Sequence, residues 1–361
     1  MSSPSPLENL SIVMLTKYGV RGASSRMRGL QYAPLFEMAG AEVSVEPLFG
    51  DAYLNALYGR RQRPFHIVAA AYLKRLAAVL QARRSGLVWV EKEVFPYLPA
   101  AFEDLLALSG VRYVVDYDDA VFHNYDMSES RLVRSLLGHK LDRLLRNAAL
   151  VTAGNDYLRE YAVSHGATRT LLLPTVIDLD RYPVTPAPNG DRLRIGWIGT
   201  PTTAPYLNAI LPAIQAVNAV RPVELVTIGA PPLPSQGFPV EQHAWSQMKE
   251  AELLSGVDVG IMPLPDEPFE RGKCAYKLIQ YMACARPVIA SPVGVNAQVV
   301  TPEVGYLASS VEEWAAALSR VAADAPLRRR QGLAGRELVE RTFSLQAQAP
   351  RLIEGLAASL S

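Results

Sequence analysis

The chain has 361 residues, which exceeds the usual size of one hydrophobic core and favours two domains of roughly 150 to 200 residues each. Its composition, 49% hydrophobic and 20% charged, is that of an ordinary globular protein and excludes a disordered or fibrous chain. The formal net charge of +1 argues against a nucleic-acid binder that neutralises many phosphates over a broad surface.

The cysteines and the N-terminal residues indicate the compartment. Cys274 and Cys284 are the only two thiols, which excludes a disulfide framework and a four-cysteine metal site and fits a reducing environment. The first apolar run, residues 12–15, is too short for a signal sequence or a membrane span. We therefore expect a cytoplasmic protein, with association at the inner face of the membrane as an open alternative.

Short apolar runs rich in β-branched residues alternate with longer segments of helical period, which is typical of βαβ units around parallel sheets. The strands predicted for the first half are residues 12–15, 43–47, 87–91, 113–116, 150–153 and 170–173. Those predicted for the second half are residues 194–198, 223–228, 257–262 and 288–291. The expected fold class is α/β, with two doubly wound, Rossmann-like domains that face a cleft.

A proline-rich segment separates the two sets of strands. Residues 180–191 contain three prolines and a glycine, which do not permit a regular element. We predict an N-terminal domain over residues 1–183, a linker over 184–191 and a C-terminal domain over 192–344, with a last helix at 345–361 that packs back on the first domain. Loops after the carboxyl ends of the strands would carry the chemistry.

The loop after the first predicted strand has an anion-binding pattern. It contains Gly22, Ser24, Ser25 and Arg26, within a segment that has three arginines in all. Glycine allows close approach of the backbone to a ligand, and a serine at a helix start offers a hydroxyl beside unpaired N–H groups. The alternative is a tight turn with an N-cap. The spacing does not match a dinucleotide-binding G-x-G-x-x-G motif.

Three carboxylates, Asp116, Asp118 and Asp119, lie at the end of the strand predicted at 113–116. They repel one another unless a cation, a ligand rich in hydroxyl groups or water compensates them. At a strand end that faces a cleft they could bind sugar hydroxyls or serve as a base. A metal site is the less favoured interpretation because no partner cluster of His or Asp occurs elsewhere. In the purely structural alternative, one Asp caps the next segment and the others are solvated.

Two segments of the second half favour binding of a diphosphate. Gly199, Thr200 and Thr203 follow a buried strand and can present N–H groups and hydroxyls. Residues 258–294 predict a strand, a charged loop, a helix from about residue 273 to 284, a strand and a glycine loop. On that helix Lys277 and Gln280 share a face, suited to a phosphate and a hydroxyl pair, unless they only solvate an outer face.

This last segment resembles the donor-binding motif of GT-B glycosyltransferases, specifically the large retaining group called family four. Residues 277–283 and 286–291, K-L-I-Q-Y-M-A and R-P-V-I-A-S, resemble its K-x-x-E-Y-M-A and G-x-P-V-V-A-S patterns. Residues 178–182 and 342–344 are similar to its N-G-V-D-x-x-x-F segment and its closing F-S. The resemblance covers most of the chain, densely in the second domain and loosely in the first.

Two departures from the family pattern affect the expected donor site. Gln280 stands where a Glu usually holds the ribose hydroxyls, and Gly272 stands where another Glu lies eight residues earlier, so that Glu270 is the nearest carboxylate. The family's usual Arg and Lys after the first strand of the second domain are also missing. An amide lacks the charge assistance of a carboxylate, so donor affinity or donor identity is expected to differ.

The resemblance implies transfer of a sugar, with retention, from a nucleotide diphosphate sugar to a glycan, lipid-linked or small-molecule acceptor. In this scheme a donor phosphate oxygen helps deprotonate the acceptor, and the protein supplies positive charge without a metal or other cofactor. The implied catalytic residues are Glu270, Lys277, Asp118 and Asp119. The implied donor residues are Gly199, Thr200, Thr203, Arg271, Gly272, Lys273, Lys277 and Gln280. The implied acceptor-side residues are Gly22, Ser24, Ser25, Arg26 and Asp116. A nucleotide-sugar epimerase and a non-catalytic nucleotide-sugar binder remain alternatives.

A charge asymmetry in the first half suggests binding to a membrane surface. Residues 52–90 contain seven basic residues and no acidic one, together with apolar residues at helical spacing. Such a basic amphipathic surface can bind anionic lipid. In the alternative, the apolar residues pack on the sheet and the charges are solvated. The seven basic residues are Arg60, Arg61, Arg63, Lys74, Arg75, Arg83 and Arg84.

Overall fold

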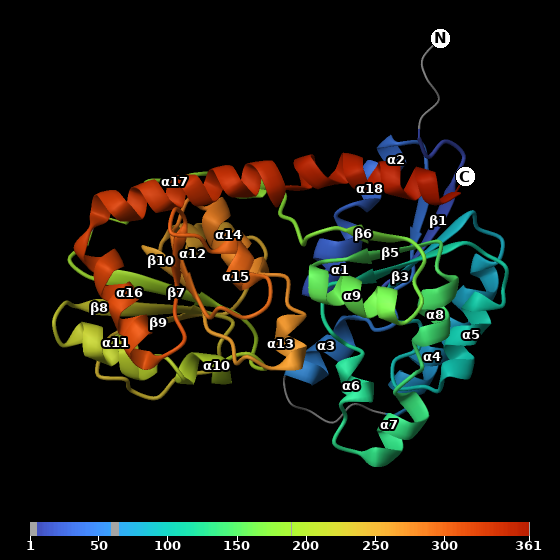
Figure 1. The fold of residues 1–361 in the computed structure, drawn as a ribbon, viewed down its shortest axis with the longest axis horizontal. Helices are drawn as coiled ribbons and strands as arrows, with labels where there is room; N and C mark the ends of the chain where they lie inside the picture. The colour runs from blue at the N-terminus through green and yellow to red at the C-terminus, as the bar shows by residue number, and fades with distance from the viewer. Residues whose placement is uncertain (1–5, 59–64, 189, 361) are drawn as a thin grey trace, which may run out of the picture. The chain divides into compact units, whose positions relative to one another are not determined.

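The computed structural model describes residues 6–58, 65–188 and 190–360. They divide into two compact units (Figure 1). The first unit runs to Thr175 and includes the C-terminal residues from Gln348, and the second is Val176–Ala347.

The first unit is built on a parallel sheet of six strands, counted over the described residues, in the order β2-β1-β3-β4-β5-β6. Strands β3, β4 and β5 are buried along their whole length, as expected for parallel strands covered on both faces. The strand bounds are β1 (Ser11–Leu15), β2 (Glu42–Val45), β3 (Leu87–Glu91), β4 (Tyr113–Tyr117), β5 (Leu150–Ala153) and β6 (Thr170–Leu172).

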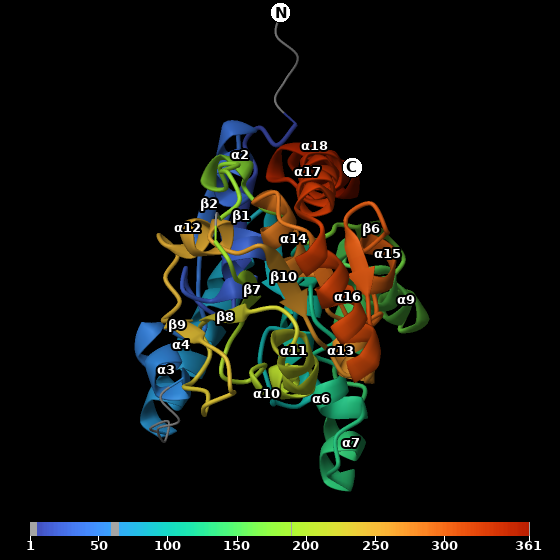
Figure 2. The same ribbon diagram turned by 90° about the vertical axis from the view of Figure 1, so that its left-hand side faces the viewer.

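Helices connect these strands, and α7 extends from the rest of the first unit in Figures 1 and 2. The first connection is a broken helix, with a π-helical turn, η1, between two α-helical pieces. The bounds are α1 (Ala23–Ser25), η1 (Arg26–Leu30), α2 (Ala33–Met38), α3 (Asp51–Tyr58), α4 (Phe65–Ala82), α5 (Ala100–Ala107), α6 (His123–Asp126), α7 (Arg131–Leu137), α8 (Asp142–Asn147) and α9 (Asp156–Ser164).

The second unit has a sheet of the same kind, again with six parallel strands among the residues described, in the order β12-β11-β10-β7-β8-β9. The central strands are almost entirely buried. The strand bounds are β7 (Leu193–Ile198), β8 (Val223–Ile228), β9 (Val240–His243), β10 (Val259–Met262), β11 (Val288–Ala290) and β12 (Gly305–Leu307).

Two hydrophobic clusters cover the two faces of this sheet. One includes α14, and the other includes α11 and α16, which lie side by side in Figures 1 and 2. The bounds are η2 (Leu179–Arg181), α10 (Pro205–Asn208), α11 (Leu211–Asn218), α12 (Glu250–Ser255), α13 (Pro268–Arg271), α14 (Tyr276–Ala283), α15 (Asn296–Val299), α16 (Val311–Ala323), α17 (Ala325–Thr342) and α18 (Leu345–Leu360).

A glycine allows α14 to pack closely on the second sheet. A Cβ at Gly260, on β10, would lie 2.0 Å from the ring of Tyr281, so a larger residue does not fit. The hydroxyl of Tyr281 accepts a hydrogen bond of 2.9 Å from the backbone N–H of Ile198 on β7. These contacts fix α14 against the strands that carry the candidate donor loops.

The predicted α/β class with two Rossmann-like units is confirmed, and each predicted strand overlaps an observed one. The sequence did not predict two short edge strands, β9 and β12. The units divide at residues 175 and 176, earlier than the predicted linker, because Ile177 pairs with Phe343 and Leu345 of the second unit. Residues 184–191 are counted with that unit.

The end of the chain groups with the first unit from Gln348 onward. Within that unit, the guanidinium of Arg169 donates a 2.8 Å hydrogen bond to the carbonyl of Ala358 on α18, and Gly355 approaches the side chains of Leu171 and Leu150. Across the described ranges, no helix is both long and apolar enough to span a bilayer.

Candidate active site

The start of α14 lies at the carboxyl edge of the second sheet, because this helix follows β10 in a parallel βαβ unit. Lys277, in its first turn, has its ammonium 3.4 Å from the hydroxyl of Thr203 and 4.8 Å from the centre of the Trp197 ring. Burial, and secondarily the neighbouring Lys273, lower the pKa of Lys277 to about 7. The ion pairs found among the described residues do not include Lys277. An anion beside it would stabilise its charged form.

The loop after β7 places two threonines next to this ammonium. The backbone N–H of Thr200 donates a 3.2 Å hydrogen bond to the Thr203 hydroxyl, which closes the turn. Glycine is required at the start of the loop, since a Cβ at Gly199 would lie 2.4 Å from the Trp197 ring. Gly199, Thr200, Thr203 and Lys277, all predicted from the sequence, therefore come together in one unit.

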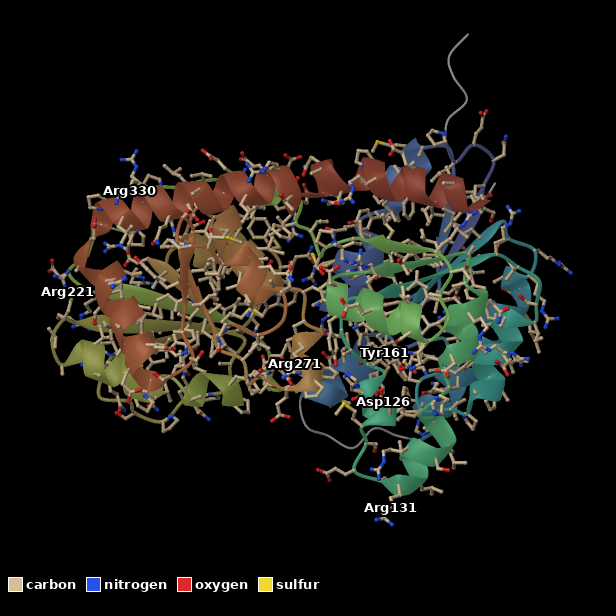
Figure 3. The ribbon with its side chains drawn as sticks, in the orientation of Figure 1. Asp126, Arg131, Tyr161, Arg221, Arg271 and Arg330 are labelled. Atoms are coloured by element: carbon tan, nitrogen blue, oxygen red, sulfur yellow. The ribbon has the colours of Figure 1, made fainter. Side chains whose placement is uncertain are left out.

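The charged residues of α13 and the following loop mostly have partners. Glu270 is 6% exposed and accepts a 2.6 Å hydrogen bond from the hydroxyl of Tyr206. Arg271, labelled in Figure 3, pairs with Asp266 at 2.7 Å on the surface. The Lys273 ammonium lies 4.9 Å from the centre of the Phe269 ring.

Gly272 is buried at the C-terminal end of α13, with an ordinary right-handed backbone conformation, and its carbonyl accepts a weak hydrogen bond from the thiol of Cys274. Of the two family Glu positions, Gly272 therefore offers no side chain to a ligand. Glu270, held by Tyr206, is the carboxylate that this stretch supplies.

Gln280 lies in a different environment from Lys277, although the two share a helix face. It is 1% exposed and lies beside the hydroxyl of Tyr182, but its side-chain nitrogen has no hydrogen-bond partner among the described residues. That hydroxyl donates to one carboxylate oxygen of Glu250, while the indole N–H of Trp245 donates to the other at 2.5 Å. Burial raises the pKa of Tyr182 well above its usual value, which keeps the phenol protonated. Gln280 therefore meets a buried polar cluster of the protein.

In the first unit, the predicted acceptor-side residue Asp116 holds the fold together. Asp116 and Arg28 are both completely buried and form a bidentate ion pair with distances of 2.6 and 3.0 Å. The hydroxyl of Thr152 donates to the same carboxylate at 2.5 Å, and Arg28 also binds the carbonyl of Leu173. Because its carboxylate has these partners and no exposed surface, Asp116 does not present a free group to a ligand.

Ser25 is likewise a buried structural group. Its hydroxyl donates a 2.6 Å hydrogen bond to Glu91 and accepts one from the backbone N–H of Tyr18. The same oxygen of Glu91 accepts from the backbone N–H of Lys17 at 2.8 Å. Burial raises the pKa of Glu91, whose carboxylate ties the loop after β1 to the end of β3. The predicted serine cap is therefore wrong: the N-cap of α1 is Gly22, without a side-chain hydrogen bond, and the Ser25 hydroxyl fixes the loop after β1 instead.

Asp118 and Asp119 are compensated by a lysine that the sequence prediction missed. The Lys92 ammonium lies 2.8 Å from Asp118 and 3.3 Å from Asp119, and it donates to the Ser24 hydroxyl at 3.0 Å. Although burial opposes it, the positive charge of Lys92 holds the pKa of Asp118 below its usual range. The described residues contain no cluster of His, Cys, Asp and Glu suited to a metal ion.

The remaining acceptor-side predictions lie in the β1–α1 loop. Arg26 is 6% exposed and donates to the carbonyl of Val20 at 3.0 Å. A Cβ at Gly22 would lie 2.5 Å from the Cβ of Tyr18, so glycine is required there for packing. Both residues shape the loop from inside.

The sequence did not predict further polar groups that lie at the same edge of the first sheet. Lys140 is fully buried between Glu93 and Glu103, at 2.8 and 3.2 Å, which fixes the loop after β3. On α6, His123 lies 2.8 Å from Asp126 and 2.7 Å from the Tyr157 hydroxyl. Figure 3 shows Asp126 with Tyr161 of α9 nearby. The charged triplet 91–93 directly after a buried strand was the available sequence signal for the first group.

One segment of the second unit matches a known protein family. Residues 192–324 match the family model described as Glycosyl transferases group 1. The comparison with curated proteins gave no match.

Solved structures show that the fold of the whole chain is that of GT-B glycosyltransferases. Sucrose-phosphate synthase from Thermosynechococcus elongatus is 19% identical, with a TM-score of 0.68 over 97% of this chain and 100% of that one. Anabaena HepE in complex with UDP and glucose is 15% identical, with the same TM-score and coverage. A glycosyltransferase from Rickettsia africae is 13% identical, with a TM-score of 0.64 over 98% of both chains.

Proposed function

We propose that the protein transfers a sugar from a nucleotide diphosphate sugar to an acceptor hydroxyl, with retention of the anomeric configuration. The observation that carries this proposal is Lys277, a largely buried ammonium with no carboxylate partner among the described residues, beside the hydroxyl of Thr203 in the turn that Thr200 begins. The family match covers this part of the chain, and a structure of the same fold was solved with UDP and glucose.

In this mechanism the second unit stabilises the departing diphosphate. Lys277 and Lys273 neutralise its developing negative charge, and the Thr200 hydroxyl donates a hydrogen bond to one of its oxygens. Thr203, whose hydroxyl is bonded within the turn, positions the Lys277 ammonium. Glu270, oriented by Tyr206, accepts a hydrogen bond from a sugar hydroxyl. The bond between the anomeric carbon and the diphosphate breaks as the acceptor oxygen attacks from the same face, and a donor phosphate oxygen takes the acceptor proton.

The first unit would bind the acceptor at the carboxyl edge of its own sheet. Asp119, whose side chain is 27% exposed, is the member of the aspartate group best placed to accept from an acceptor hydroxyl, since Asp118 is more deeply buried against Lys92. This scheme uses no metal and no further cofactor.

Thermal-shift and product assays test the proposal. Uridine, guanosine and adenosine diphosphates are screened first, because a ligand that binds only the native state raises its melting temperature. Lys277→Ala should lose this stabilisation, whereas the matched control Lys249→Ala, at an exposed lysine of the same unit, should keep it. Equal nucleotide binding by Lys277→Ala and the wild type would refute the donor site.

Product analysis separates the enzyme alternatives. An epimerase would convert the donor sugar with no acceptor present, and a non-catalytic binder would bind nucleotide without transfer across an acceptor panel. Retention predicts that the product keeps the anomeric configuration of the donor, which proton NMR of the product reports directly. An inverted product would overturn the proposed stereochemistry and leave the transferase assignment intact.

We further propose that helix α4 binds an anionic membrane surface at the cytoplasmic face, next to a lipid-linked acceptor. Phe65 and Leu73 on α4 are 84% and 68% exposed, and Arg83 and Arg84 are exposed beyond its C-terminal end. Exposed apolar residues along α4 and basic residues just beyond its end match the charge and polarity of such a surface.

Not all seven predicted basic residues contribute. Arg75 is buried and binds the carbonyl of Thr16, so it is not part of the surface, and Lys74 lies 3.2 Å from Glu46. Arg60, Arg61 and Arg63 lie outside the described residues. Co-sedimentation with vesicles of anionic or neutral lipid tests the idea. Arg83→Glu with Arg84→Glu should abolish salt-sensitive binding, and recovery of the wild type in the supernatant with both lipids would contradict it.

A further inference from the structure

The loop after β1 carries a partly buried ammonium that has no carboxylate within ion-pair distance among the residues the structure describes. Lys17 follows the strand directly, and its Nζ lies 5.8 Å from the centre of the Tyr18 ring. Within the described part of the chain, its side chain forms no ion pair and no hydrogen bond is found for its Nζ. Its backbone N–H, in contrast, is bound by Glu91. The main chain of Lys17 is therefore fixed while its charge is left to an external partner.

A second lysine, Lys92, makes the positive charge of Lys17 unfavourable unless an anion is bound. Lys92 lies close enough that its charge helps to lower the pKa of Lys17, after the larger effect of burial. Three carboxylates in the neighbourhood, Glu93, Glu91 and Asp119 in order of effect, raise the pKa of Lys17 and offset only part of this lowering. Lys92 already has two carboxylates within ion-pair distance, so it needs no further anion. Of the two lysines, Lys17 is the one without a carboxylate at ion-pair distance in the described part of the chain.

The loop that presents Lys17 is held rigidly and contains no negative charge. Tyr18 forms a parallel bridge with Phe49, and its N–H is bound by the buried Ser25. The guanidinium of Arg21 donates to the neutral amide of Asn55 on α3 at 2.9 Å, so a second cation of the loop is also paired only with a neutral group. Residues 9–36 contain no acidic residue. Such preorganisation favours binding of an anion.

We propose that the β1–α1 loop binds a phosphate group of the acceptor, with Lys17 as its principal partner and Arg21 as a second cation. This deepens the proposed function and rests on it, since the donor diphosphate is assigned to Lys277 in the other unit. A phosphate carries up to two charges and matches the compact ammonium of a lysine. The acceptor is thus a phosphorylated molecule, either a lipid-linked phosphate or a soluble sugar phosphate.

Calorimetry with the full-length protein, first saturated with UDP, tests this site. Glucose 1-phosphate and a polyprenyl phosphate in detergent micelles are titrated separately, with glucose and empty micelles as blanks. We expect at least one phosphate compound to bind the UDP-saturated wild type, and Lys17→Met to weaken that binding by about tenfold or more while UDP affinity is unchanged. Binding of the soluble or of the micellar probe alone identifies the source of the phosphate.

Stability measurements separate ligand binding from a structural role. Because the charge of Lys17 is partly buried near a like charge, the melting temperature of Lys17→Met without ligand should equal or exceed that of the wild type. Lys17→Arg, which keeps the charge, should retain most of the phosphate binding. Wild-type phosphate affinity in Lys17→Met, or no phosphate binding by the UDP-saturated wild type, would overturn the proposal.

The outcome for the donor site is independent of this result. If UDP fails to bind but a phosphate compound binds and Lys17→Met abolishes that binding, the donor assignment fails and the phosphate site stands. If UDP binds and is lost in Lys277→Ala, while no phosphate compound binds afterwards, the donor assignment stands and the phosphate site fails.

Discussion

Lys277 should couple donor binding to proton uptake. In the free protein burial, followed by the repulsion of Lys273, lowers the pKa of Lys277 to about 7, from the usual 10.5. This difference corresponds to about 5 kcal/mol in favour of the neutral amine relative to water. A bound diphosphate stabilises the ammonium and raises the pKa again. Between these two pKa values, the complex holds a proton that the free protein lacks.

The sign and size of the pH effect follow from this cycle. As the pH rises above about 7, the free protein loses its proton from Lys277, and the affinity for nucleoside diphosphate should fall by about tenfold per pH unit until the pKa of the complex is reached. The β-phosphate of UDP titrates near pH 6, so measurements between pH 7 and 9 avoid its contribution. Proton uptake should approach one per UDP at pH 8.5.

Calorimetry in buffers of different ionisation enthalpy measures this uptake directly. Lys277→Arg keeps its charge over the whole range, so it should bind UDP without proton uptake. Lys277→Ala should bind weakly with no pH dependence and should lower transition-state stabilisation by roughly 2 to 4 kcal/mol. Lys249→Ala, the control at an exposed lysine, should show the same pH dependence of UDP affinity as the wild type. A wild-type affinity that does not change between pH 7 and 9 would contradict the assigned partner.

The same pKa sets the sign of a stability effect in the protein without ligand. Since the folded state lowers the pKa of Lys277, folding favours its neutral amine over its ammonium. Stability from this group is fully present above pH 10.5 and is lost as the pH falls toward 7. Lys277→Met should therefore raise the melting temperature relative to wild type more at pH 7 than at pH 10.

Three further substitutions test the structural roles assigned above by chemical denaturation. Asp116→Asn should lower the free energy of unfolding by about 3 to 5 kcal/mol, because it leaves the buried guanidinium of Arg28 uncompensated. Gln280→Glu should destabilise the second unit by bringing another carboxylate toward the cluster that contains Glu250, and the added change Glu250→Gln should restore part of the loss. Gly260→Ala should cost about 1 to 3 kcal/mol, since the added methyl overlaps an aromatic ring. A variant that unfolds at the same denaturant concentration as the wild type would refute the role assigned to its substituted residue.

The sequence predicted most of the fold because buried parallel strands are nearly continuous apolar runs. It did not predict β9, which reads V-E-Q-H, or the three-residue β12, because edge strands are short and half exposed and lack that pattern. The helix expected from residue 273 begins at Tyr276, after Ala275 turns the chain with a left-handed φ of 53°. Propensity alone does not reveal such a turn.

The candidate site was partly predictable for a similar reason. Lys277 and Thr203 follow adjacent parallel strands, so their meeting follows from topology. The partners of individual side chains are not set locally, as Asp116 and Asp118 show. They are two residues apart and indistinguishable by type, yet Arg28, 88 residues away in sequence, makes the first a structural group, whereas Lys92 pairs with the second.

The distinction between cations that stabilise the fold and cations that bind ligands rests on what neutralises them. Arg28, Lys92 and Lys140 are buried against carboxylates, and the attraction within such pairs offsets much of the cost of desolvating the two charges. In the described part of the chain, Arg75 and Arg286 have no carboxylate within ion-pair distance but donate to backbone carbonyls.

Lys17 and Lys277 have neither kind of partner among the described residues, and burial beside a second lysine lowers the pKa of both. Selection for stability alone would replace such groups with apolar side chains of similar volume. One of these two lysines lies at the carboxyl edge of each sheet, where ligands bind in folds of this class. A transferase needs two anion-binding positions of this kind if its donor and its acceptor both carry phosphate, and the two substitutions Lys17→Met and Lys277→Ala should therefore abolish binding of different substrates.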